Sequence, residues 1–274
     1  MKQLTIYQII LLLLSAIINI SCGTMSYLQT SVPEEGGVNF VKLTQDMDNV
    51  VGNKVYTMRS VITWWASPQI ALSSDGTQIA YISEKNNTRN IMLKKTDKAG
   101  SSIQRTFRNN VMDLSWHPNG ESIVFSESKN NRSSIYVIKA EEGSILQQLS
   151  NGPSDDFNPV YSLDGKLIYF SRKDTYGNSI WSYNTQNNLF TQYSLGYTPF
   201  PIKGEMCTLL CTRNSTNNRG EIWKINYETG VETLILSDNE KSFSTPQLSP
   251  DGKWILCMGS SLSNSYYQKK KQCG

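Results

Sequence analysis

The feature that most constrains this chain is an internal repeat. Four stretches align, each with a turn glycine between a polar run and an apolar run: SSDGTQIAYIS from Ser73, HPNGESIVFSE from His117, SLDGKLIYFSR from Ser162 and SPDGKWILCMG from Ser249. Successive turn glycines lie 44, 45 and 87 residues apart: Gly76, Gly120, Gly165 and Gly252. The last gap is two periods, which predicts a degenerate copy with its turn at Pro201-Ile202-Lys203-Gly204.

A second set of residues supports the same period. An isoleucine follows the turn glycine by 15 residues in each of the first three copies, and by 18 residues in the fourth: Ile91, Ile135, Ile180 and Ile222. The longer spacing indicates an insertion at Asn214 to Arg219. Because these isoleucines did not define the alignment, their shared spacing shows that the repeat is real.

Each copy contains the pattern of four short strands. An inner strand such as 158–162 leads to an Asp-Gly turn, and an apolar strand such as 167–170 follows. After a polar loop comes a third strand such as 180–183, and after a second turn (Glu142-Gly143, Thr229-Gly230) an outer strand ending in 148–150 or 233–235. Four strands every 44 or so residues predict an all-β chain, a β-propeller of four-stranded antiparallel blades with five recognisable blades.

The pattern S-x-D-G-K-x-I-x-F-S, followed by a polar loop and Ile-Tyr or Ile-Trp, resembles the WD-like propeller repeat of the TolB family. The resemblance covers about Phe40 to Met258. It implies a periplasmic or lipid-anchored six-bladed propeller that binds other envelope proteins or peptides. The chain departs from the family in lacking the N-terminal α/β domain and in showing five turn motifs instead of six.

The N-terminus has the pattern of a targeting segment. Lys2 precedes an apolar run from Leu4 to Ile20, which is short for a membrane-spanning helix. Cys22 directly after this run resembles the lipidated cysteine of bacterial lipoproteins, although Asn19 replaces the usual Leu or Val. An ordinary cleaved signal or an uncleaved anchor is the alternative. We expect a lipoprotein signal peptide over 1–21, lipidation at Cys22, a flexible tether over 22–39 and the propeller over 40–274.

Ring closure leaves alternatives open. Phe40 to Thr44 resembles an outer strand that would complete the blade begun at Ser244. The tail from Gly259 to Gly274 is too short and polar for another blade. The ring therefore has five blades, or gains part of a sixth from Asn49 to Trp65, or belongs to a six-bladed parent that lacks its end. We favour the last of these interpretations.

The composition and motifs argue against a catalytic or metal-binding site. The only histidine, His117, precedes Pro118-Asn119-Gly120 and takes a turn position, so a Ser-His-Asp triad or a His-rich metal site has little support. The Asp-Gly carboxylates Asp75, Asp164 and Asp251 fall in separate blades, where they bond the local backbone. With neither a G-x-S-x-G elbow nor a P-loop, we expect no catalytic residues, metal ligands or cofactor-binding residues.

The cysteines and aromatic residues favour packing roles. Cys207 and Cys211 lie four residues apart on one strand, roughly 13 Å when extended, too far for a disulfide. Buried thiols are the favoured interpretation, with a Cys211–Cys257 disulfide between neighbouring blades as an alternative. The recurring aromatic residues are expected to pack between blades, except that one of Trp64 and Trp65 is expected to be exposed.

These observations predict a non-enzymatic envelope lipoprotein whose propeller is a protein–protein interaction scaffold. We expect it in the periplasm or at the cell surface, held at the outer membrane by its lipid. The balance of 26 Lys and Arg against 23 Asp and Glu, net +3, is too even to predict a nucleic-acid binder, and we expect no nucleic-acid partner. The alternatives are the propeller portion of a prolyl oligopeptidase-like peptidase without its catalytic domain, and a glycan-binding propeller.

Overall fold

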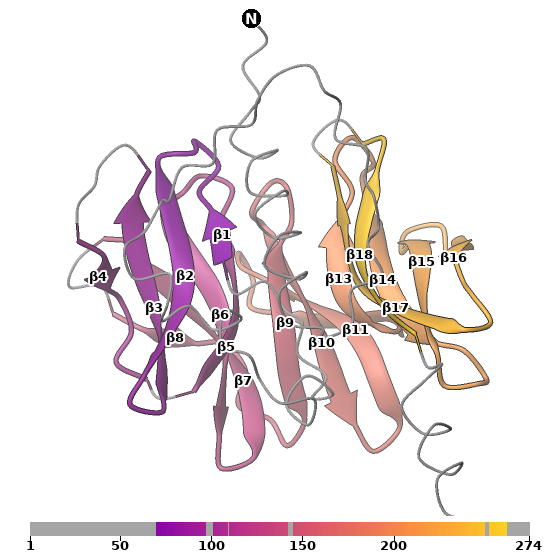
Figure 1. The fold of residues 1–274 in the computed structure, drawn as a ribbon, viewed down its shortest axis with the longest axis horizontal. Helices are drawn as coiled ribbons and strands as arrows, with labels where there is room; N and C mark the ends of the chain where they lie inside the picture. Colours follow the sequence, from indigo (N-terminus) through magenta and orange to yellow (C-terminus); the bar gives the residue numbers. More distant parts are fainter. Residues whose placement is uncertain (1–69, 97–100, 109, 142–144, 250–251, 262–274) are drawn as a thin grey trace, which may run out of the picture.

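The computed structural model describes residues 70–96, 101–108, 110–141, 145–249 and 252–261, which form five antiparallel sheets (Figure 1). We call them blades 1 to 5 in chain order. Blade 1 holds β1 (Ile70–Leu72), β2 (Gln78–Lys85), β3 (Thr88–Lys95) and β4 (Ile103–Gln104). Blade 2 holds β5 (Val111–Trp116), β6 (Ser122–Lys129), β7 (Arg132–Lys139) and β8 (Gln147–Gln148).

Blade 3 holds β9 (Asp155–Tyr161), β10 (Leu167–Asp174), β11 (Gly177–Asn184) and β12 (Phe190–Leu195). Blade 4 holds β13 (Tyr197–Pro201), β14 (Thr208–Asn214), β15 (Gly220–Asn226) and β16 (Glu232–Leu236). Blade 5 holds β17 (Lys241–Leu248) and β18 (Ile255–Ser261). Within the described ranges we find no helix with the length and apolar character needed to cross a membrane.

The turns form where the repeat predicts them. The backbone is left-handed at the turn glycine of every blade, with φ of 72° at Gly76, 74° at Gly165 and 85° at Gly204 in the degenerate copy. In the well-matched copies this glycine donates its N–H to the carbonyl three residues earlier, as from Gly165 to Ser162 at 3.0 Å. Only glycine adopts this conformation without steric cost, so the glycine spacing reports blade spacing.

The isoleucine that follows each turn glycine lies near the centre of the third strand of its blade. Ile91, Ile180 and Ile222 have no exposed surface, and Ile135 is 1% exposed. The insertion expected after Asn214 is the tip of the β14–β15 hairpin, because Asn214 pairs with Gly220. The two predicted periods therefore correspond to one hairpin turn and one core position in each blade.

The apolar core lies between the blades. Alternate residues of a strand face opposite neighbours: in β10, Ile168 and Phe170 pack toward blade 2, whereas Tyr169 packs toward blade 4. The inner strands β1, β5, β9, β13 and β17 lie against one another in order, and in Figure 1 the outer strands β4 and β16 stand at opposite edges. The sheets thus pack face to face with their inner strands adjacent. This arrangement confirms the predicted propeller of four-stranded antiparallel blades.

Four blades are complete in the described residues, and the fifth is described through its first two strands. Several sequence-based predictions concern segments outside the described residues: the signal over 1–21, Cys22, the tether over 22–39, the strand Phe40 to Thr44, the Trp64-Trp65 pair, the Glu142-Gly143 turn and Asp251. These stay predictions, as does the number of blades in the closed ring.

Candidate binding site at the propeller axis

Three inner strands have an unusual backbone at one equivalent position. Asn158 in β9, Thr198 in β13 and Thr245 in β17 have φ of 52°, 52° and 55°. Each lies at a break in the register with the second strand, and each precedes a proline. Left-handed backbone is rare for a residue branched at Cβ, so the two threonines show that surrounding contacts impose this conformation.

Those contacts link blades 3, 4 and 5 each to the blade before it. The N–H of Asn158 donates to Asp113 Oδ2 of blade 2 at 2.9 Å. The N–H of Thr198 donates to Ser171 Oγ of blade 3 at 2.9 Å, and that of Thr245 to Thr212 Oγ1 of blade 4 at 3.2 Å. We call this set of bonds the axial ladder. The bulge turns one amide of each of these three inner strands sideways, where it bonds the neighbouring blade.

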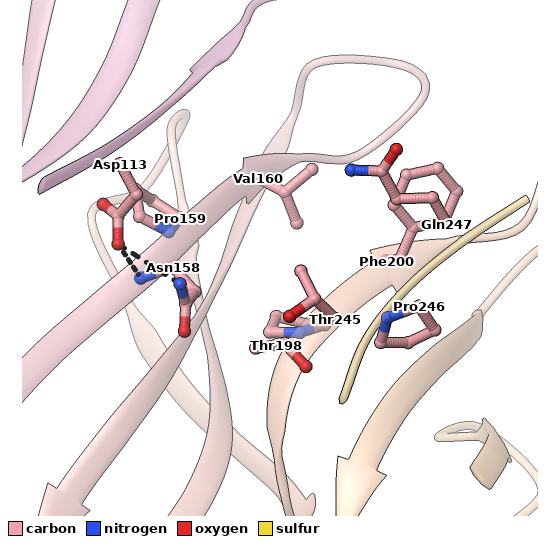
Figure 2. Close-up of a pocket in the computed structure, with 10 residues that line it drawn as sticks. Asp113, Asn158, Pro159, Val160, Thr198, Phe200, Thr245, Pro246 and Gln247 are labelled. Atoms are coloured by element: carbon pink, nitrogen blue, oxygen red, sulfur yellow. Dashed lines mark hydrogen bonds between the residues drawn. The ribbon is translucent and has the colours of Figure 1, made fainter. Parts of the chain in front are cut away.

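The first rung of the axial ladder is centred on a carboxylate. Asp113 is 1% exposed and accepts hydrogen bonds from the N–H and hydroxyl of Ser126 within its own blade. Its second oxygen accepts from the backbone and side-chain nitrogens of Asn158 at 2.9 and 3.2 Å (Figure 2). A buried carboxyl group needs this degree of hydrogen bonding, and here the bonds join blades 2 and 3.

A small cavity opens beside the axial ladder. We call it the axial pocket; it is lined by Asp113, Asn158, Pro159, Val160, Thr198, Pro199, Phe200, Thr245, Pro246 and Gln247. Its volume is about 40 Å³, room for about three waters. Figure 2 shows Val160, Phe200 and Gln247 gathered on one side, and the Asp113–Asn158 pair on the other. The pocket mixes apolar walls with fixed polar groups, but it cannot enclose a substrate.

His117 lies between the hairpin turns of blades 2 and 3. Its Nδ1 accepts the N–H of Asn119 at 3.1 Å, and its ring packs edge-on against Tyr161 with 4.6 Å between centroids. The His117 ring lies so close to Gly165 that a side chain at position 165 would overlap it. The sequence-based turn assignment is confirmed, and the histidine also packs against blade 3.

The Asp-Gly carboxylates bond their own turns. Asp75 accepts the Ser73 hydroxyl at 2.6 Å and the Thr77 N–H at 3.0 Å, and the Ser73 bond contributes most to lowering the Asp75 pKa to about 2. Asp164 accepts the Ser162 hydroxyl at 2.7 Å in the same way. Among the described residues no three His, Cys, Asp or Glu side chains come together as a metal site would require.

The Cys211–Cys257 alternative is wrong: both thiols are free, as is Cys207. Cys211 packs toward blade 3 with Tyr169, whereas Cys257 packs against the cluster that holds Leu210, on the opposite face of β14. Adjacent residues of a strand face opposite ways, so the sheet separates the two sulfurs. Burial raises the pKa of the Cys211 thiol to about 12.

Most described tryptophans pack as predicted. Trp116 donates its indole N–H to the Ala71 carbonyl at 3.0 Å, and Trp181 lies under the Arg172 guanidinium at 4.4 Å. Trp254 differs, because it is 73% exposed at the β17–β18 turn. The sequence did not reveal the axial pocket, although the pairs Asn158-Pro159, Thr198-Pro199 and Thr245-Pro246 were the available signal.

Repeated four-stranded sheets joined through bonded inner strands define a β-propeller. The TolB beta propeller domain family matches residues 24–269, and the chain belongs to that family. The fold resembles putative TolB from Agrobacterium tumefaciens, with a TM-score of 0.61, 17% identity and coverage of 72% of this chain and 74% of that one. It also resembles TolB from Acinetobacter baumannii, with a TM-score of 0.58, 18% identity and coverage of 70% and 51%.

The chain is also similar to a protein that is named as a peptidase. The uncharacterized peptidase YuxL of Bacillus subtilis (strain 168) is 26% identical over 199 residues. This match takes in 69% of the present chain but spans 28% of the length of that protein.

Proposed function

We propose that this protein is a non-enzymatic scaffold of the cell envelope that binds a protein or peptide partner over the axial pocket. The observation that carries the proposal is the row of left-handed residues Asn158, Thr198 and Thr245 around that pocket. Non-glycine residues held in this conformation cluster at functional sites, where rigid neighbours maintain them. The axial ladder supplies that rigidity here.

The size of the pocket favours surface recognition. A cavity of about 40 Å³ takes the tip of one side chain, not a whole small-molecule ligand. Val160 and Phe200 give such a tip an apolar wall, while Asp113 and Asn158 place polar groups beside it. Protein interfaces commonly seat one anchor residue in a pocket of this mixed kind.

Site-specific crosslinking tests this proposal. A photo-crosslinking amino acid at Gln247, on the wall of the axial pocket, should capture a discrete partner in envelope preparations. The matched control carries the same group at Thr233, on the exposed outer strand β16. Val160→Arg, which fills the pocket, should abolish the Gln247 product. Identical products at both positions, or a Gln247 product unaffected by Val160→Arg, would contradict binding at the axis.

We further propose that the chain is lipid-anchored through Cys22 at the outer membrane, on the periplasmic or outer side. The apolar run before that cysteine supports this, and the family resemblance supports an envelope location. Labelling with an alkyne fatty acid should mark the full chain but not Cys22→Ser. An equal signal from both chains would exclude lipidation at this cysteine.

The match to YuxL favours one alternative, the propeller portion of a peptidase. Under that alternative the chain is inert alone and acts only with a catalytic domain. A fluorogenic prolyl-peptide assay of the full chain tests whether it has activity of its own, and the same assay of the chain together with the partner captured at Gln247 tests whether it serves a separate catalytic subunit. Turnover that a serine-hydrolase inhibitor abolishes would overturn the non-enzymatic assignment.

A further inference from the structure

A second cavity lies between blades 1 and 2, away from the axis. We call it the blade 1–2 groove; it is lined by Gln78, Leu93, Lys94, Lys95, Ser101, Ile103, Arg105 and Ala140. Its volume is about 170 Å³, about four times that of the axial pocket. Three of its residues are cationic and none is acidic, and Glu141 beyond Ala140 is not part of the lining.

The arginine of this groove is incompletely bonded. One terminal nitrogen of Arg105 donates to the carbonyl of Ala140 in blade 2. The Nε of the same guanidinium is buried without a hydrogen-bond partner. Leaving a buried donor unpaired carries a free-energy penalty, and Arg105 is not held there by any ion pair in the described part of the chain.

Comparison with the next blade shows that the fold does not require this arginine. The N–H of Arg105 donates to the Ile91 carbonyl at 2.8 Å, and the N–H of Leu149 donates to the Ile135 carbonyl at 2.8 Å. The two residues therefore occupy one repeat position, and Leu149 packs there against the core between blades 2 and 3. Blade 1 has a cation where blade 2 has an apolar side chain.

The remaining walls limit what the cation can bind. Leu93 is 4% exposed, and Ile103 pairs with it across the β3–β4 ladder. Lys95 pairs with Gln78 on the same face of the sheet as Leu93 and places a second positive charge at the groove. A ligand that fits these walls would place an anionic group beside Arg105 and Lys95. Its apolar stem would lie against Leu93 and Ile103.

We propose that the blade 1–2 groove binds a carboxylate that carries a short aliphatic stem. This site is separate from the axial pocket, so the inference goes beyond the proposed scaffold function. Such a carboxylate belongs either to a small organic acid or to the C-terminus of a peptide. Planar carboxylates match the guanidinium fork, whereas the apolar walls disfavour a fully hydrated anion such as phosphate.

The test uses butanoate, acetate, butanamide, inorganic phosphate and acetyl-alanyl-leucine as probes, titrated against the full chain by ligand-observed NMR. Butanoate should bind on the order of tenfold more tightly than acetate, because two further methylenes are buried. Butanamide and phosphate should bind at least tenfold more weakly than butanoate. Comparable affinity for either would overturn the proposal.

Arg105→Leu provides the sharpest variant, because leucine already occupies this repeat position in blade 2. We expect it to keep the parent urea midpoint and to weaken butanoate binding by tenfold or more. The matched control, Lys203→Gln, removes one positive charge from an exposed turn of blade 4 and should leave binding unchanged. A folded Arg105→Leu chain that binds butanoate like the parent would refute the site.

The peptide probe distinguishes the two sources of the carboxylate. Tighter binding of acetyl-alanyl-leucine than of butanoate, lost in Arg105→Leu, assigns the groove to a peptide C-terminus. Tighter binding of butanoate assigns it to a small organic acid. Failure of every carboxylate to bind would refute the groove and leave the crosslinking test at the axial pocket unaffected.

Discussion

The contact between His117 and Gly165 yields a prediction with an internal control. Gly165 and Gly120 have nearly the same backbone, with φ of 74° and 76°. A methyl group at Gly165 would overlap His117 Nε2 and stand 2.5 Å from its Cε1, whereas one at Gly120 would meet only Ser74 Oγ at 3.9 Å. Alanine at the two positions therefore differs in packing and not in backbone strain.

The expected losses in the free energy of unfolding follow from backbone strain, which both variants share, and from overpacking, which only Gly165→Ala has. Left-handed backbone costs alanine about 1–2 kcal/mol. The stiffer unfolded chain returns about 0.4–1 kcal/mol, so Gly120→Ala should lower the free energy of unfolding by about 1 kcal/mol. Gly165→Ala adds overpacking of about 1–3 kcal/mol, because the imidazole cannot move without losing the Asn119 N–H bond or the Tyr161 contact.

Urea unfolding of the full chain, followed by tryptophan fluorescence, measures both variants. His117→Ser in the Gly165→Ala background should recover about 1–3 kcal/mol, and in the Gly120→Ala background it should recover none. Equal losses at the two glycines would refute the argument. So would the absence of coupling between His117 and Gly165.

Three further outcomes are expected. Asp113→Ala should lower the free energy of unfolding by about 3 kcal/mol or more, because the buried donors around this carboxylate lose their acceptor; a urea midpoint within error of the parent would contradict the axial ladder. Hydrogen bonds from Arg213 lower the pKa of Glu232 below its ordinary 4.5, so the unfolded state takes up its proton first and stability falls as pH drops below about 4.5. Glu232→Gln should flatten Tm between pH 5 and pH 3, and an unchanged slope would exclude this pair as a cause. Iodoacetamide at pH 8.5 should modify half-buried Cys207 well before buried Cys211, as read by peptide mass spectrometry, and the reverse order would contradict the packing.

The repeat made the blades predictable because it is carried by local requirements. Gly76 and its equivalents are fixed by left-handed turns, and Ile91 and its equivalents by a buried strand centre. Neither depends on which blade lies alongside. The same landmarks located even the degenerate fourth copy through Gly204 and Ile222.

The axial pocket was not predictable because it depends on neighbouring blades. Threonine has a low intrinsic preference for positive φ, so apart from the proline that follows each of them nothing local marks Thr198 or Thr245. Their conformation is held by acceptors about 30 residues earlier in the chain, Ser171 and Thr212. The Cys211–Cys257 pairing failed for a related reason, since strand alternation decides which neighbour a side chain faces.

The axial ladder also has a direction along the polypeptide. In each rung the acceptor precedes the donor in sequence: Asp113 before Asn158, Ser171 before Thr198, and Thr212 before Thr245. Because the ribosome makes the chain from its N-terminus, each acceptor is already present when the inner strand that carries its donor is made. Blades can be added one at a time onto a finished edge, so assembly of the propeller can keep pace with translation.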